Sequence, residues 1–207
     1  DPAFVNWGLY QCGLDTARIA IGDNLLRKPC ATELMRLNKS FIVKRSAKGP
    51  REMAKTFSEL SSYIADSLHE GHNIWIAQKE GRAKDGDDCT DPAILKMFHM
   101  AGKQKKLGFV EYMQQLNIVP VAISYEYDPG DEAKARELYE TSTNGSYQKS
   151  EFEDIESIVA GIIGYKGRVH VNVGKPLTDG FTTPEELAAA IDQAIHAQYR
   201  LFASNLL

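Results

Sequence analysis

Short apolar runs alternate with longer amphipathic segments along this chain, and this alternation constrains the fold more than any other feature. The run 41–43 is followed by a helix signal at 50–68 and then by a second run at 74–77. Pro50 suits the first turn of a helix. The apolar residues of this helix recur at spacings of three and four: Met53, Phe57, Leu60, Ile64 and Leu68. A strand, a helix and a second strand in this order predict one repeating unit of an α/β fold.

The same alternation continues on both sides of this unit. We expect further strands at 18–21, 118–123 and 168–173, and we expect Pro120 to mark an edge position or a strand start. Further helices are predicted over 2–13, 25–37, from 91 onward, 109–116, 152–163 and from 183 into the C-terminal region. Residues 128–150 are polar and include 141–146, which are predicted to form a mobile loop. The sequence therefore predicts a mixed, mainly parallel sheet flanked by helices.

The composition is that of a domain with a sizeable core and no strong overall charge. The chain has 207 residues, 43% of them hydrophobic, and a net charge of -4. We expect a single domain over 1–207, with the functional motifs in 1–126 and a C-terminal part over 127–207. A negative net charge gives no general field for nucleic acid, so no nucleic-acid partner is predicted. Three widely separated cysteines favour a reducing compartment, and hence a cytoplasmic location.

Charged residues follow three of the predicted strands. Lys44 and Arg45 follow the first, and the stretch Trp75–Asp88 runs from an apolar segment, expected to be a strand buried on both faces, into Lys79, Glu80, Gly81 and Arg82. Tyr125 and Glu126 follow the third. If the strands are parallel, these ends share one edge of the sheet, where open α/β sheets place their sites. Two basic pairs there would suit a phosphate, although each pair alone is also typical of an ordinary solvated surface.

Four segments in order resemble the glycerophospholipid acyltransferase superfamily, which includes glycerol-3-phosphate and lysophosphatidic acid acyltransferases. Asp1-Pro2 is similar to the Asp of the family's His-x4-Asp block, and 22–26 resembles the segment after it. Residues 41–46 resemble the second block, an apolar strand ending in basic residues. Residues 80–86 resemble the third block, centred on Glu-Gly and a following Arg, and 118–123 the Val-Pro-Val-like fourth. The resemblance covers about residues 1–126.

This resemblance implies an acyltransferase-like fold and an O-acyltransferase of phospholipid biosynthesis. It implies transfer of a fatty acyl group from acyl-CoA or acyl-carrier protein to a hydroxyl of a phosphorylated glycerol, with no other cofactor. It assigns the catalytic Asp to Asp1, which would orient a His acting as general base. The substrate-binding residues that it implies are Lys44, Arg45, Glu80, Gly81 and Arg82.

Two departures from the family pattern leave alternatives open. The His of the first block would lie upstream of Asp1, so either the sequence lacks its N-terminal segment or the protein lacks this base. The third block here has no extra residue, often Thr, between Gly81 and Arg82, which affects the geometry expected for the acceptor. A non-catalytic module that binds phosphate or a lipid headgroup is the alternative function, and it explains an absent His directly.

Membrane and metal interactions are predicted to be limited. The chain has no apolar run of about 20 residues, so any membrane contact is expected to be peripheral, at the inner face of the membrane. Phe4, Trp7 and Tyr10 could line an acyl groove, but core packing is the alternative for each. His69 and His72 have the spacing of a metal-binding pair, yet a position at a helix C-terminus is sufficient to explain them. No metal site is predicted.

Overall fold

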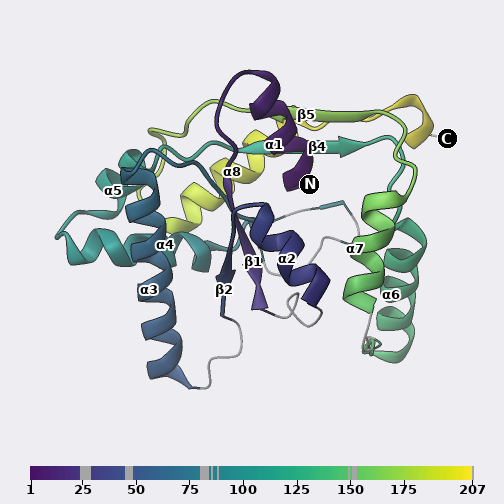
Figure 1. Ribbon diagram of the computed structural model, residues 1–207, viewed down its shortest axis with the longest axis horizontal. Coiled ribbons are helices and arrows are strands. Elements are labelled where there is room, and N and C mark those ends of the chain that lie inside the picture. Colours follow the sequence, from purple (N-terminus) through teal and green to yellow (C-terminus); the bar gives the residue numbers. More distant parts are fainter. Residues whose placement is uncertain are drawn as a thin grey trace.

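A computed structural model describes residues 1–23, 29–44, 49–79, 84, 86–87, 89–148, 150 and 153–206. Helices and strands alternate along the chain, with two helices in succession at α4–α5 and α6–α7, which gives a mixed α/β architecture (Figure 1). The elements are α1 (Pro2–Gln11), β1 (Arg18–Gly22), α2 (Pro29–Leu37), β2 (Ser40–Val43), α3 (Pro50–His69), β3 (Ile74–Trp75), α4 (Pro92–Gln104), α5 (Phe109–Leu116), β4 (Val121–Tyr125), α6 (Asp131–Asn144), α7 (Glu153–Ile163), β5 (Val169–Val173), α8 (Pro184–Gln198) and the 3-10 helix η2 (Ala203–Asn205).

Three strands form a small parallel sheet in the order β2-β1-β3. Ile19 pairs with Ser40 of β2 and with Trp75 of β3, so β1 is the central strand. α2 lies between β1 and β2 in the chain, and α3 lies between β2 and β3, so each change of strand is made through a helical crossover, as parallel pairing requires. The predicted parallel arrangement is confirmed for these three strands.

The remaining two strands form a separate antiparallel pair. β4 and β5 pair over their whole length, from Val121 with Val173 to Tyr125 with Val169. The α6–α7 segment connects them and lies at one end of the molecule, on the side opposite α3 and α4 (Figure 1). The expectation that β4 would end at the edge of the parallel sheet is therefore wrong, because its backbone groups pair with β5.

The core lies where α3, α4, α5, α8 and β4 meet. Leu95, Met113, Ala122 and Leu187 are each at most 2% exposed. Ser61 joins α3 to α4, because its hydroxyl donates to the Phe98 carbonyl at 2.8 Å and accepts from the Ala101 amide at 3.0 Å. α8 begins at the predicted Thr183 cap with a complete capping box.

Two sequence-based expectations need correction. β3 is a strand of two half-buried residues and is not buried on both faces. Among the described residues it pairs with β1 alone and is an edge strand. Residues 141–144, predicted as part of a mobile loop, belong to α6, and the polar stretch 131–140, for which no helix was predicted, forms the rest of that helix. This helix buries none of its residues, so it lacks the apolar periodicity by which amphipathic helices are recognised.

Candidate functional site

The parallel sheet brings two predicted basic positions to one edge. Lys44 follows β2 directly, and Lys79 lies four residues beyond β3; both side chains are exposed. Neighbouring strands lie about 4.8 Å apart, so β2 and β3 run about 10 Å apart on either side of β1. β2 ends opposite Gly22, three residues further along β1 than the end of β3 opposite Ile19. This edge is the carboxyl end of parallel strands, where α/β proteins bind ligands.

A cavity of about 200 Å³ lies beside Lys44, between β2 and α3. Its apolar wall includes Phe41 and Tyr63, whose ring centroids are 4.9 Å apart. Thr56 and Glu59 of α3 supply polar groups to the same cavity. Lys44 is a predicted binding residue, whereas the sequence analysis did not single out Thr56 and Glu59, although their spacing along the helix places them beside its apolar face.

Four of the predicted binding residues, Arg45, Glu80, Gly81 and Arg82, lie outside the described residues. The two chain segments that flank 80–88 are nevertheless joined. Thr90 donates to Asp192 Oδ1 from its backbone N–H at 2.8 Å and from its hydroxyl at 2.5 Å. Gln78 Nε2 lies 3.4 Å from the same oxygen. Asp192, on α8, therefore holds both ends of the segment that carries the third block.

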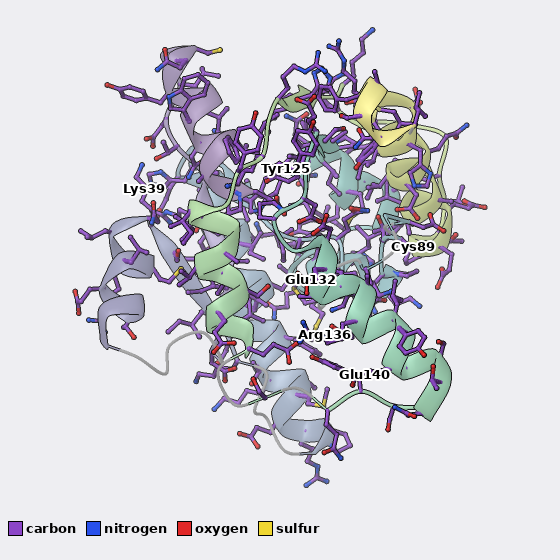
Figure 2. The ribbon with its side chains drawn as sticks, turned by 90° about the vertical axis from the view of Figure 1, so that its right-hand side faces the viewer. Lys39, Cys89, Tyr125, Glu132, Arg136 and Glu140 are labelled. Atoms are coloured by element: carbon purple, nitrogen blue, oxygen red, sulfur yellow. The ribbon has the colours of Figure 1, made fainter. Side chains whose placement is uncertain are left out.

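Two side-chain contacts, one of them an ion pair, tie further positions of this segment to helices. Lys84 Nζ lies 2.7 Å from Glu137 Oε2 of α6, and the two side chains are only 18% and 20% exposed. Asp87 Oδ1 lies 3.6 Å from His196 Nε2 of α8. Figure 2 shows Glu132, Arg136 and Glu140 along α6, and Cys89 next to α8. The helix that the sequence failed to predict thus supplies a partner for the third block.

Asp1 lies at the N-terminus of α1, next to the end of β4. Its Oδ1 accepts a hydrogen bond from the Tyr125 hydroxyl at 2.5 Å. Figure 1 shows the N-terminus near β4. The β2 arrow points away from the N-terminus, so the end of β2 lies at the far end of the parallel strands. The described residues therefore bring Asp1 together with Tyr125 and do not bring it into contact with Lys44.

A second charged group at the end of β4 is fully paired. Glu126 Oε1 lies 3.1 Å from Arg168 Nη2, while Oε2 accepts from Arg168 Nε and from its backbone N–H. These hydrogen bonds from Arg168 lower the pKa of Glu126 from 4.5 to about 2. The pair joins β4 to the start of β5 and leaves Glu126 without a free oxygen for chemistry.

This pair predicts a specific acid sensitivity. Because the folded-state pKa of Glu126 is depressed, its stabilisation is present above pH 4.5 and is lost as the pH falls toward about 2. We expect Glu126→Gln to remove this part of the pH dependence, so that urea midpoints measured at pH 5, 4 and 3 fall less steeply than in the wild type. Glu132→Gln, on exposed α6, is the control and should leave the slope unchanged; an unchanged slope in Glu126→Gln would contradict the assignment.

The described part of the chain has neither a cluster of side chains for a metal ion nor a helix that could cross a membrane. Among those residues, no group of three or more His, Cys, Asp or Glu side chains is arranged to hold a metal ion. His72 lies 3.9 Å from Asp15 and 3.8 Å from Glu70, in a set of surface charges at the start of β1. None of the described helices has both the length and the apolar character needed to cross a bilayer.

A comparison with models of protein families and a search of curated proteins found no match to this chain.

Proposed function

We propose that this chain is the acyltransferase domain of an enzyme that esterifies a phosphorylated glycerol. The acyl donor is a thioester, acyl-CoA or acyl-carrier protein, and the acceptor is glycerol 3-phosphate or lysophosphatidic acid. The proposal rests on the order of the four sequence blocks. One structural observation supports it most: β2, which carries the start of the second block, and β3, which precedes the third block, are parallel and flank β1.

The charges at this edge suit the acceptor. Lys44 beside its cavity, together with Arg45, would bind the phosphate, with Arg supplying a planar fork and Lys a point charge. Glu80 would hold the glycerol or a basic neighbour, and Arg82 would make a second phosphate contact. Asp192 and Glu137 would keep this segment in place through the contacts of Thr90 and Lys84.

In the proposed reaction, one proton moves from the acceptor hydroxyl to the His and then to the thiolate that leaves. The acceptor hydroxyl attacks the thioester carbonyl while a His, placed by the family's first block, removes its proton. Asp1 would orient this His and stabilise its protonated form. Backbone N–H groups near Gly81 would stabilise the tetrahedral oxyanion. The carbon–sulfur bond then breaks, the proton passes to the thiolate, and the products are the ester and the free thiol.

Acyl transfer by the full chain, including the family's first block, tests the proposal. We expect palmitoyl-CoA and glycerol 3-phosphate or lysophosphatidic acid to give an ester and an equal amount of free CoA. Arg45→Lys keeps the positive charge but loses the planar guanidinium, which can donate two parallel hydrogen bonds to a phosphate. The acceptor KM should therefore rise roughly 10- to 100-fold, while acyl-CoA binding is unchanged. Arg45→Ala should be worse, and Glu80→Ala should also impair turnover.

Arg36→Lys is the matched control, because Arg36 is an exposed arginine on α2 with a 73% exposed side chain. Binding of the acceptor without any ester formation would favour the non-catalytic binding module. If Arg45→Lys and Arg45→Ala both bind the acceptor like the wild type, Arg45 is a surface charge and the site assignment is wrong.

A further inference from the structure

Two helices of this chain begin with the same dipeptide, Asp-Pro, but their aspartates behave differently. At the start of α4, Asp91 caps the helix, since its Oδ1 accepts from the Ala93 backbone N–H at 2.9 Å. This is the usual arrangement for an Asp at a helix N-terminus. At the start of α1, the side chain of Asp1 makes no capping hydrogen bond, although its carbonyl accepts from Phe4 at 3.0 Å. A contact elsewhere in the fold therefore outweighs the local preference of Asp1.

That contact is the hydroxyl of Tyr125, 2.5 Å from Asp1 Oδ1. Tyr125 is itself held in place: it is the last residue of β4, pairs with Val169, and receives the Phe4 ring edge-on at a centroid distance of 6.0 Å. Burial, and to a lesser extent the charge of Asp128, raises the pKa of Tyr125 to about 12. The hydroxyl consequently stays protonated at neutral pH and is a permanent donor. Figure 2 shows Tyr125 close to α1.

We infer that Tyr125 is a positioning residue that turns the Asp1 carboxylate away from its helix cap and fixes it for the catalytic His. The inference rests on the proposed acyl transfer and adds to it a residue that no sequence block contains. Oδ1 is taken by Tyr125, and no residue in the described part of the chain donates to Oδ2. A carboxylate held by one oxygen presents the other in a fixed plane, which is what an imidazole N–H requires.

The contact crosses 124 positions of sequence and joins α1 to the end of β4. Without the hydroxyl, the Asp1 side chain is free to return to the cap of α1, which competes with its role toward the His. Tyr125→Phe removes the hydroxyl alone and keeps the ring against Phe4. Tyr127→Phe is a matched control, because Tyr127 lies two residues further along and stacks on Tyr165 at 5.7 Å.

The experiment measures acyl transfer by the full chain and its variants. We expect Tyr125→Phe to lower kcat about tenfold, with the KM for palmitoyl-CoA and for the acceptor changed less than about twofold. Tyr127→Phe should match the wild type. On an Asp1→Asn background, Tyr125→Phe should cause no further loss, because the hydroxyl acts through Asp1. In urea unfolding, Asp1→Ala, which removes the acceptor, and Tyr125→Phe should show a coupling of about three- to tenfold in the unfolding constant.

The outcomes separate this inference from the proposed function. A wild type that transfers no acyl group overturns the proposed function and, with it, any positioning for catalysis. An active wild type with an unchanged kcat in Tyr125→Phe overturns this inference alone, as does a full tenfold loss on the Asp1→Asn background. Absence of unfolding coupling shows that the hydrogen bond is not made in solution and also overturns it.

Discussion

Asp1→Asn should lower the kcat of acyl transfer about 100- to 10,000-fold, the range expected when general-base catalysis is lost. Asn has nearly the same shape as Asp but carries no charge. It therefore cannot stabilise a protonated His, and its amide can hold the ring in the wrong tautomer. The acyl donor and the acceptor should still bind, because neither contacts Asp1 in the proposed arrangement. Steady-state kinetics and equilibrium binding of palmitoyl-CoA measure the two effects separately.

Asp91→Asn provides the control for this substitution. Asp91 precedes a Pro and caps α4, so the change tests the loss of a charge at a helix N-terminus without touching the proposed site. Asn is as good a cap as Asp, and we expect near-wild-type stability and turnover. If Asp1→Asn turns over like Asp91→Asn, Asp1 does not orient a catalytic base, and the resemblance of Asp1-Pro2 to the family's first block has no functional meaning here.

The elements that the sequence predicted well are those in which local chemistry and packing agree. α3 carries its apolar residues on one face, and four of them, Phe57, Leu60, Ile64 and Leu68, enter or touch the core. α8 starts at a capping box between Thr183 and Glu186. α6 was missed because its residues pack against little and its mean character is polar. The sequence does contain one signal for the start of α6: Asp131 and Glu132 are acidic residues in its first turn, where they suit a helix N-terminus.

The site was predictable only where residues follow strands directly. Lys44 could be placed at a sheet edge, because a strand signal and the parallel order fix where it emerges. The contacts that hold the site together join distant parts of the chain: 102 positions separate Thr90 from Asp192, and 124 separate Tyr125 from Asp1. No periodicity or motif in one sequence encodes such hydrogen bonds between side chains. Thr and Asp are also common residue types whose hydrogen-bonding groups can pair with many other partners or with water, so their presence alone does not predict this contact.

Asp192→Ala should lower the free energy of unfolding by roughly 2 to 4 kcal/mol and weaken acceptor binding as well. Thr90 is 8% exposed, so its backbone N–H and its hydroxyl would both lose their acceptor in a place that water reaches poorly. Each buried donor left without an acceptor lowers the free energy of unfolding by about 1 to 3 kcal/mol. The ends of the segment bearing Glu80 and Arg82 would then lose the contacts of Gln78 and Thr90 with α8 and keep that of Asp87 with His196, which should raise the acceptor KM more than it lowers kcat.

Asp192→Asn separates the geometry of this contact from its charge. The amide oxygen can accept the same hydrogen bonds. We therefore expect the Asp192→Asn variant to retain more than half of the unfolding free energy that Asp192→Ala loses. Urea unfolding gives the stabilities, and initial rates at varied acceptor concentration give the KM. If alanine and asparagine lose the same stability, the charge of Asp192 matters and its oxygen does not. If alanine costs less than about 0.5 kcal/mol, Thr90 finds other partners, and α8 does not hold the third block.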